Sequence, residues 1–371
     1  MPDWADRSKL GVHMLKIGAV QLDAPVVQAA LSGYSDLAMR RMARRHGAAF
    51  ALNEVVLDKL VLTPGKGRRG IFNVPEDDHP VGGQIMGAEP EQFARAADLM
   101  VSGGYDTIDI NFGCPVRKVL GRRRGGFLLS RPDTALEMVK RVVEMVAGRV
   151  PVSIKMRRGM DDSYESERGF FRILDGTIGL GIAAVTVHGR TVRQRYVGPS
   201  DWSFLARVKR HVGELTILGS GDLFCAEDAV RMMRETGVDG VSLARGCIGN
   251  PWIFNETRAL LAGKPVPPPP SVAEQGRTIL EHYELADRLY GDKKTPRVMR
   301  KFGIRYARLH PCYVQVRDAF VKASSCEEWH EVIRRWYDPE RGWPPVTRRT
   351  SRPDLIAAGA RTQAADCSAT G

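Results

Sequence analysis

A cysteine stands at the end of a hydrophobic run, where a strand would give way to a loop. The run from Asn111 to Pro115 reads NFGCP, and its glycine and proline force a sharp exit that can display the side chain of Cys114. A thiol with an ordinary pKa of about 8.5 is mostly protonated at neutral pH, so Cys114 can donate a proton to a bound substrate. Because cysteines are often small buried hydrophobic residues, a purely structural Cys114 is the alternative.

Two ionisable side chains interrupt or end other apolar runs. Lys155 lies within VSIKM, where a central strand would otherwise be apolar. Since a buried lysine is unfavourable unless it meets an anion, we expect Lys155 to bind a ligand, with a structural salt bridge as the alternative. His188 ends the run VTVH and directly precedes Gly189. It is a second candidate, and a histidine satisfied by ordinary hydrogen bonds is its alternative.

Glycines follow two later runs and suggest an anion site. Residues 219–222 read GSGD, and residues 244–246 read ARG, with Asn250 at a predicted helix start soon after. Glycine lets the backbone approach an anion, and Arg245 adds a fixed charge with several donors. We therefore expect a phosphate site here, and ordinary turn glycines are the alternative.

The elements that must position these residues alternate regularly. Eight short β-branched runs alternate with amphipathic helical stretches, which is typical of a parallel sheet with crossover helices. Eight repeats favour a closed TIM (β/α)₈ barrel, an α/β fold, over the open doubly wound sheet that periodicity alone does not exclude. The predicted strands are Val26 to Ser32, Ala49 to Val56, Val81 to Met86, Thr107 to Phe112, Val150 to Met156, Ala183 to His188, Leu215 to Gly219 and Gly240 to Ala244. The predicted helices include Asp36 to His46, Pro90 to Ser102, Pro132 to Ala147, Trp202 to Val212 and Ala226 to Thr236.

In a closed parallel barrel the reactive groups meet at one end. The carboxyl ends of the strands form the active-site face, and the loops after strands seven and eight commonly hold a phosphate. Cys114, Lys155 and His188 lie toward the ends of predicted strands four, five and six, and the two glycine motifs follow strands seven and eight. We therefore expect one site at the barrel mouth.

A proline-rich segment divides the chain. Residues 263–270 read GKPVPPPP, a stiff spacer that cannot continue the preceding helix. We expect a barrel domain at 1–262, this linker, a small all-helical C-terminal domain at 271–345 and a mostly disordered tail at 346–371, because the tail has few large apolar residues. The helices predicted after the linker are Glu274 to Tyr290, Thr295 to His310, Tyr313 to Lys322 and Cys326 to Trp336.

Composition indicates which partners and which cellular location to expect for the protein. The net charge of +12 favours a polyanionic partner such as a nucleic acid, although many basic proteins bind none. No apolar run approaches the ~20 residues of a membrane span, so we expect no membrane partner and a cytoplasmic location. The six cysteines lack the paired spacing of a zinc site and the density of a disulfide scaffold, so we expect reduced thiols and no metal.

Several motifs, taken in order along the chain, resemble the dihydrouridine synthase family. NFGCP is followed by Lys118-Val119, similar to the signature of that family. Further matching motifs extend the resemblance over roughly Lys16 to Trp336: Asn53-Glu54, GQIMG at 83–87, Lys155-Met156-Arg157, VHGRT at 187–191, Arg245-Gly246 and GNPWIF at 249–254.

The resemblance implies a reaction and a cofactor. It implies FMN-dependent reduction of uridine to dihydrouridine in tRNA or another structured RNA, with NADPH as reductant. Hydride would reach C6 of uracil, and Cys114 would protonate C5. FMN would contact, from its ring to its phosphate, Ala30, Leu31, Ser32, Gln84, Lys155, His188, Ser220, Gly221, Asp222, Ala244 and Arg245.

The resemblance also implies that the helical domain binds the RNA. On the helix predicted from Thr295 to His310, four cations lie on one face beside an apolar stripe. They are Arg297, Lys301, Arg305 and Arg308. A solvated basic face is the alternative, and Arg122 to Arg124 form a second candidate surface. We expect a monomer.

Two other functions stay open at this point. One is a flavin-dependent reductase of a small pyrimidine-like molecule, against which the C-terminal helices argue. The other is an RNA-binding relative that has lost turnover through changed FMN contacts at Ala30, Ser220 and Ala244.

Overall fold

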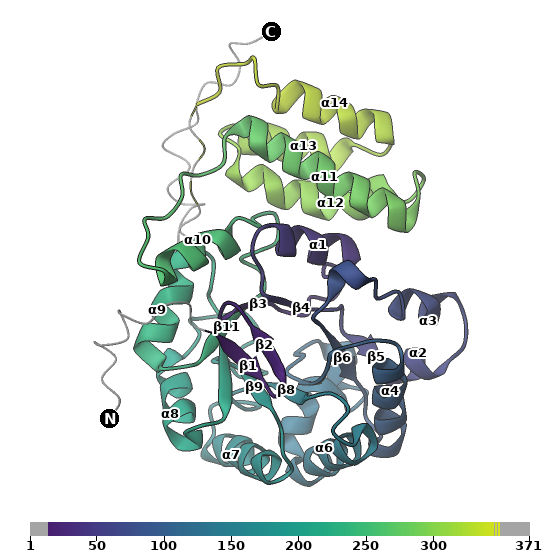
Figure 1. The fold of residues 1–371 in the computed structure, drawn as a ribbon, viewed down its shortest axis with the longest axis vertical. Coiled ribbons are helices and arrows are strands. Elements are labelled where there is room, and N and C mark those ends of the chain that lie inside the picture. The colour runs from purple at the N-terminus through teal and green to yellow at the C-terminus, as the bar shows by residue number, and fades with distance from the viewer. Residues whose placement is uncertain (1–13, 345, 347, 349–371) are drawn as a thin grey trace.

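Eight parallel strands form a closed barrel in the computed structural model, which describes residues 14–344, 346 and 348 (Figure 1). Neighbouring strands follow the order β4-β3-β11-β10-β9-β8-β7-β6, and β6 pairs with β4 to close the ring. The predicted TIM barrel is therefore confirmed, and the open sheet is excluded. The barrel strands are β3 (Val26–Gln28), β4 (Phe50–Leu52), β6 (Val81–Met86), β7 (Thr107–Phe112), β8 (Val152–Arg157), β9 (Ala184–His188), β10 (Thr216–Ser220) and β11 (Gly240–Leu243).

The second predicted strand is interrupted in the structure. After β4 the ladder breaks, and a short strand, β5 (Val56–Leu57), pairs with the end of β6. The side-chain Oδ1 of Asn53 accepts the backbone N–H of Gln84 at 2.7 Å, a donor that a continuous strand would have paired with a carbonyl. A side chain thus replaces the backbone at this point of the ladder.

Helices surround the barrel and start at local signals. Proline occupies the first turn of α4 and α6, where its missing N–H has no intrahelical partner to lose. The side chain of Asp36 caps α1 by accepting from the N–H of Met39 at 2.9 Å. The helices are α1 (Leu37–Arg45), α4 (Pro90–Ser102), α6 (Pro132–Val146), α7 (Tyr164–Gly179), α8 (Trp202–Val212), α9 (Ala226–Thr236) and α10 (Ile253–Leu261).

Short elements that we did not predict complete the barrel. An antiparallel hairpin of β1 (Leu15–Ile17) and β2 (Val20–Leu22) turns at Gly18, whose φ of +58° favours glycine. A Cβ on Gly18 would lie 2.9 Å from Pro151, just before β8, so the hairpin covers the amino-terminal end of the barrel. The other short elements are α2 (Asp58–Leu62), α3 (Lys66–Ile71), η2 (Glu76–Asp78), α5 (Arg117–Leu120) and η3 (Gly125–Ser130).

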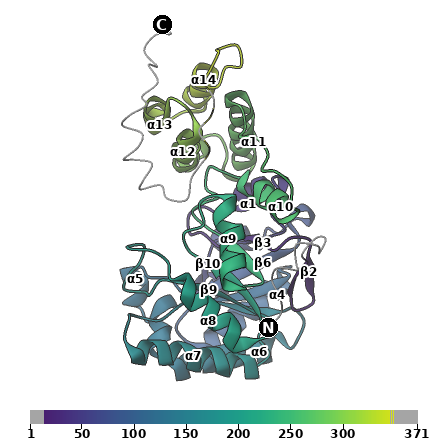
Figure 2. The same cartoon turned by 90° about the vertical axis from the view of Figure 1, so that its left-hand side faces the viewer.

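Four α-helices follow the proline-rich segment and stack beside α1 and α10 (Figures 1 and 2). Serine caps begin α11 and α14, each with a glutamate three residues later that completes a capping box. The helices are α11 (Val272–Tyr290), α12 (Thr295–Tyr306), the short η4 (Ala307–Leu309), α13 (Tyr313–Lys322) and α14 (Cys326–Trp336). The all-helical C-terminal part is confirmed, whereas its independence as a domain stays a prediction.

Four further expectations concern the thiols, membrane spans, metal sites and the C-terminal tail. Cys114, Cys225 and Cys326 are free thiols, but Cys312 is disulfide-bonded, so the expectation of reduced thiols throughout is wrong. Spacing along the chain does not show which thiols meet in space. Among the described residues, no helix is both long and apolar enough for a membrane span, and no group of three acidic, histidine or cysteine side chains can hold a metal. The predicted tail lies outside the described residues apart from 346 and 348.

Candidate active site

The carboxyl ends of the strands open into a cavity of about 420 Å³. Small-molecule sites commonly measure about 300–1,000 Å³, so this volume suits a cofactor or substrate. Parallel strands bring their ends to one rim, which explains why residues far apart in sequence meet here. All the residues predicted for catalysis and cofactor binding line it: Ala30, Leu31, Ser32, Gln84, Cys114, Lys155, His188, Ser220, Gly221, Asp222, Ala244 and Arg245.

The loop after β7 holds Cys114 at the rim. Asn111 Oδ1 accepts the backbone N–H groups of Gly113 and Cys114, each at 3.0 Å, and the carbonyl of Cys114 accepts from Gly126 N at 3.1 Å. Burial raises the pKa of the half-buried thiol, and the Val116 backbone and the Arg157 charge oppose that shift only in part. Cys114 is therefore protonated at neutral pH, which suits a proton donor rather than a thiolate nucleophile.

A polar ladder crosses the inside of the barrel behind this loop. Gln84 Nε2 donates to Asp109 at 2.6 Å, and Gln84 Oε1 accepts from Asn111 Nδ2 at 2.7 Å. Ser153 Oγ donates to the other oxygen of Asp109 at 2.6 Å. The second Nε2 hydrogen and the second Oε1 lone pair of Gln84 are left to meet a ligand, and the ladder fixes the orientation of this amide before anything binds.

Lys155 places a cation without a hydrogen-bond partner beside the cavity. Its side chain is partly exposed, but Nζ is buried and lacks a hydrogen-bond partner within the described structure. Burial lowers the pKa of Lys155 to about 8, opposed by the charge of Asp109 and assisted by that of Arg157. A buried polar group without a partner is unfavourable, so an acceptor supplied by a ligand would stabilise this lysine.

His188 is neutral and presents a donor. Burial holds its pKa well below the ordinary value, and the charges of Arg157, Lys155, Arg190 and Arg245 act in the same direction. Its Nδ1 accepts the backbone N–H of Arg190 at 3.1 Å, so the single ring proton lies on Nε2.

The loop after β10 needs a glycine and is held by an ion pair. Gly221 has φ of +114°, and a Cβ there would lie 2.3 Å from Ser200 Oγ. The carboxylate of Asp222 accepts from Arg190 Nη2 and from the backbone N–H of Ser200, both at 2.7 Å. Asp222 therefore orders this loop, and its predicted contact with the phosphate end of a cofactor stays a prediction.

The loop after β11 brings Arg245 to the same end of the cavity. Its guanidinium lies 4.4 Å from the ring centroid of Tyr196 and 5.2 Å from that of Phe224. Ala244 is not among the described non-glycine residues with positive φ, so its methyl group introduces no backbone strain.

Two residues of the site escaped the sequence prediction. Arg157 donates to the carbonyls of Gly113 at 2.9 Å, Thr191 at 2.9 Å and Arg195 at 2.7 Å, so it joins the cysteine loop to the loop after β9. Tyr196 lies in that second loop, 55% exposed, with Arg157 5.4 Å from its ring centroid. Arg157 stood two residues after Lys155 and within the Lys155-Met156-Arg157 motif, whereas no signal in the sequence indicated Tyr196.

Residues 27–335 match the model of the family described as Dihydrouridine synthase (Dus). The chain belongs to the dihydrouridine synthase family. It is 34% identical over 330 residues to a "Probable tRNA-dihydrouridine synthase" of Mycobacterium tuberculosis (strain ATCC 25618 / H37Rv), covering 86% of this chain and 84% of that protein. It is 33% identical over 325 residues to "tRNA-dihydrouridine synthase B" of Xanthomonas campestris, covering 87% and 96%. The resemblance inferred from the motifs is thus confirmed, and the protein is an enzyme of this family.

Solved structures share the fold of this chain. Histamine dehydrogenase from Rhizobium sp. 4-9 gives a TM-score of 0.55 at 13% identity, covering 76% of this chain and 51% of that one. Morphinone reductase in complex with tetrahydroNAD gives 0.51 at 15% identity, covering 70% and 93%. At such identities the likeness establishes the barrel fold alone.

Membership of the family implies a flavin cofactor, and the cavity fits one. The unpartnered Nζ of Lys155 suits the polar edge of a ring that gains negative charge. Gly221 and Arg245 line the same cavity, so a glycine backbone and a guanidinium are both available to a ligand there. An anionic tail fits there, because glycine allows close backbone approach and arginine supplies charge.

The four predicted RNA contacts do not share one open surface. Arg297 is exposed, but Lys301 turns its ammonium to the carbonyl of Gly33, and Arg305 lines the cavity. Arg308 is partly buried, and burial lowers its pKa. In the second candidate surface, Arg122 and Arg123 are exposed whereas Arg124 is 8% exposed. All the roles in RNA binding stay predictions.

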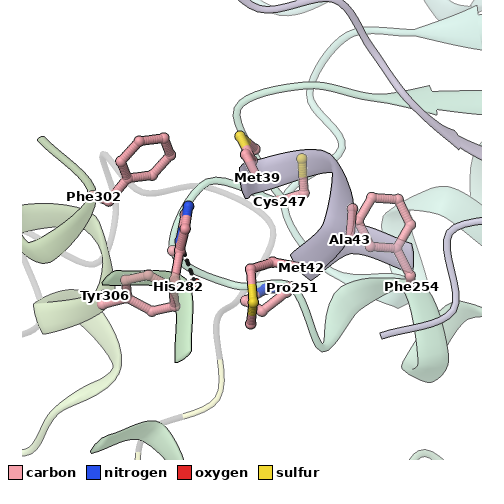
Figure 3. Close-up of a pocket in the computed structure, with 10 residues that line it drawn as sticks. Met39, Met42, Ala43, Cys247, Pro251, Phe254, His282, Phe302 and Tyr306 are labelled. Atoms are coloured by element: carbon pink, nitrogen blue, oxygen red, sulfur yellow. Dashed lines mark hydrogen bonds between the residues drawn. The ribbon is translucent and has the colours of Figure 1, made fainter. Parts of the chain in front are cut away.

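A small cavity of about 10 Å³ lies where the barrel and the C-terminal helices pack against each other (Figure 3). His282 Nδ1 lies 3.1 Å from the hydroxyl of Tyr306, and burial lowers the pKa of His282 to about 3. A space of this size holds at most one water molecule, so it is no substrate site. It is lined by Met39, Met42, Ala43, Cys247, Gly249, Pro251, Phe254, His282, Phe302 and Tyr306, which shows how closely the two parts pack.

Proposed function

We propose that the protein reduces uridine to 5,6-dihydrouridine in tRNA, with FMN as cofactor, NADPH as reductant and Cys114 as proton donor. One observation carries the proposal: the protonated thiol of Cys114 and the buried ammonium of Lys155, which has no hydrogen-bond partner in the described part of the chain, face the same cavity. The names of relatives that are about one-third identical over most of their length support tRNA as the substrate.

The cavity residues divide into three groups in this proposal. Ala30, Leu31 and Ser32 form the wall beside the flavin ring. Gln84 and Lys155 meet its polar edge, and the Nε2–H of His188 lies between that edge and the phosphate end. Bound FMN would supply the hydride, since the cofactor carries the redox chemistry. The phosphate end would be held by Ser220, Gly221, Asp222, Ala244 and Arg245.

Cys114 contributes a proton at Sγ. The turn built on Asn111 fixes the cysteine backbone, and Arg157 anchors the same turn through the Gly113 carbonyl. After protonating C5 of the pyrimidine, the thiolate would regain a proton from solvent. The positive charge of Arg157 would stabilise this transient thiolate, because a nearby cation favours the anionic form.

The uracil must leave its stack to reach this cavity. Extrusion of a base costs a few kcal/mol, which contacts with the RNA backbone can offset. Arg305 at the rim and Arg297 on the exposed face of α12 are the proposed phosphate contacts. A monomeric, cytoplasmic enzyme is part of the same proposal.

Three measurements on the purified full-length chain test the proposal. The absorption spectrum should show bound flavin, NADPH should reduce it, and cells lacking the protein should lose dihydrouridine at defined positions of their tRNA. NADPH consumption driven by free pyrimidines without RNA would instead establish a small-molecule reductase. Tight RNA binding without flavin would establish a relative that has lost turnover.

A further inference from the structure

Lys301 faces the barrel rather than solvent. It lies in the middle of the basic series on α12, but its Nζ donates to the backbone carbonyl of Gly33. The same Nζ lies 5.1 Å from the ring centroid of Tyr34 and 5.2 Å from that of Phe302. The ammonium is therefore engaged by the loop between β3 and α1, and it is poorly placed to bind an RNA phosphate.

The loop that Lys301 contacts forms one wall of the cavity. Ala30, Leu31, Ser32 and Tyr34 all line the cavity, and Gly33 lies between them with φ of +76°. Within the loop, Leu31 N donates to Ser35 Oγ at 2.8 Å, and Tyr34 N donates to the Leu31 carbonyl at 2.9 Å. These bonds hold the turn together locally. Contacts from neighbouring elements, among them Lys301 on α12, hold the turn against the rest of the protein.

Two partly buried carboxyl groups lie within reach of the Lys301 charge. Burial raises the pKa values of Asp36, at the start of α1, and of Glu54, after β4, and the charge of Lys301 opposes both shifts. The hydroxyl of Tyr290, from α11, donates to Asp36 at 2.9 Å. The backbone of Gly33 also interacts with Glu54 and lowers its pKa. Gly33 is thus contacted from the barrel side by Glu54 and from the helical side by Lys301.

Helix α12 packs closely against this loop and against the loop after β11. The ring of Phe302 meets Tyr34 edge-on, with centroids 5.4 Å apart. A Cβ on Gly249, in the loop after β11, would lie 2.4 Å from the backbone carbon of Arg305. The cavity of about 10 Å³ in Figure 3 is the space left beside Phe302 and Tyr306 in this contact. Dense packing of this kind transmits a displacement of one element to its neighbour.

We propose that Lys301 is a positioning residue that ties the cavity-lining loop after β3 to helix α12, so that the C-terminal helices hold one wall of the cofactor cavity in shape. The inference rests on the proposed function in one respect, namely that FMN is the ligand of the cavity. Without the ammonium, the Gly33 carbonyl loses its donor, and Asp36 and Glu54 lose a compensating charge. The loop then samples more conformations, and ligand binding must order it again.

The test compares Lys301→Met, Lys301→Arg and a charge-matched control, Lys322→Met, whose side chain is exposed at the end of α13. Hydrogen exchange of residues 29–36 is measured in the full-length chain without FMN, and FMN affinity is measured by quenching of flavin fluorescence. Lys301→Met should speed exchange in this loop and weaken FMN binding about tenfold, as expected for loss of a charged hydrogen bond. Lys301→Arg should restore most of both, and the control should match the wild type.

RNA binding separates this role from a phosphate contact. Loss of a phosphate contact lowers the slope of log affinity against log salt by ~1, whereas Lys301→Met should leave the slope unchanged. Wild-type exchange and FMN affinity together with a lowered slope would overturn the inference. Should Lys301→Met fail to fold, wild-type FMN affinity and loop exchange in Lys301→Gln would overturn it instead. If the wild-type chain binds no FMN, the proposed function fails, whereas exchange in the loop still decides this inference.

Discussion

Lys155 on the barrel wall and Lys301 on the C-terminal helices differ in whether their ammonium groups have hydrogen-bond partners within the described protein. Nζ of Lys155 on β8 is buried without a hydrogen-bond partner in the described part of the chain, and its pKa is lowered to about 8. Nζ of Lys301 on α12 has a carbonyl acceptor and two aromatic rings nearby. An unsatisfied buried cation is stabilised when a ligand arrives, whereas a satisfied one stabilises the protein that surrounds it. Lys155 on the barrel wall is therefore suited to binding a ligand, whereas Lys301 on the helical side is suited to holding the cavity-lining loop in place.

The largest expected effect is on catalysis and comes from removing the proposed proton donor, Cys114. Cys114→Ala should lower dihydrouridine formation about 10²- to 10⁴-fold, because protonation by a positioned acid contributes that range. FMN affinity should stay close to that of the wild type, since the thiol is assigned to the substrate. Single-turnover reduction of RNA by the prereduced protein measures the chemical step. Cys326→Ala, a half-buried free thiol on α14, is the control, and equal losses in both variants would remove Cys114 from the mechanism.

The next effect concerns the unsatisfied lysine itself. Lys155→Met removes a buried ammonium that has no hydrogen-bond partner among the described residues, while Asp109 keeps its hydrogen bonds from Gln84 and Ser153. The protein without ligand should therefore melt at a higher temperature. The same change should weaken FMN binding about 10- to 100-fold, because a hydrogen bond to a charged group is lost. Opposite signs in these two measurements distinguish a ligand-binding lysine from a structural one. A lower melting temperature with unaltered FMN affinity would contradict the comparison of the two lysines.

A pH dependence follows from the pKa of Lys155. Its folded pKa of about 8 lies below the unfolded value, so the unfolded chain binds more protons between about pH 8 and 10.5, and this group adds stability as pH rises through that window. FMN affinity should change in the opposite direction and weaken above about pH 8, by at most about tenfold per pH unit, because the ammonium loses its proton. Titrations from pH 7 to 9.5 should show this decline in the wild type and not in Lys155→Met. A flat wild-type profile would show that the charge of Lys155 does not contribute to binding.

The smallest effect separates the cations of α12. Arg297→Ala should lower the salt slope of RNA binding by ~1 and leave FMN affinity unchanged, because Arg297 is exposed and outside the cavity. Arg305→Ala should lower the slope similarly and also weaken FMN binding slightly, because Arg305 lines the cavity. Salt titrations of RNA affinity, each paired with an FMN titration, measure both quantities. Identical FMN affinities in the two variants would show that Arg305 belongs with Arg297 as an RNA contact only.

Local patterns in the sequence determined which segments form the barrel and which residues reach its mouth. The bounds predicted for β6, β7, α4, α8 and α9 agree with the structure, since hydrophobic period and terminal residues are local signals. The eight repeats were enough to predict closure, and closure brings every strand end to one rim. For this reason the predicted cofactor residues and Cys114 line a single cavity.

Only the tertiary structure decided which groups each of these side chains contacts. The spacing of Lys301 and Arg305 places both on one side of a helix, but it does not show that this side lies against the loop after β3 and the cavity rim. Likewise, nothing local indicates that Arg157 joins two loops or that Asn53 replaces the backbone at the break between β4 and β5. Periodicity describes an element relative to its own axis, whereas these contacts depend on how elements distant in the chain are packed against one another.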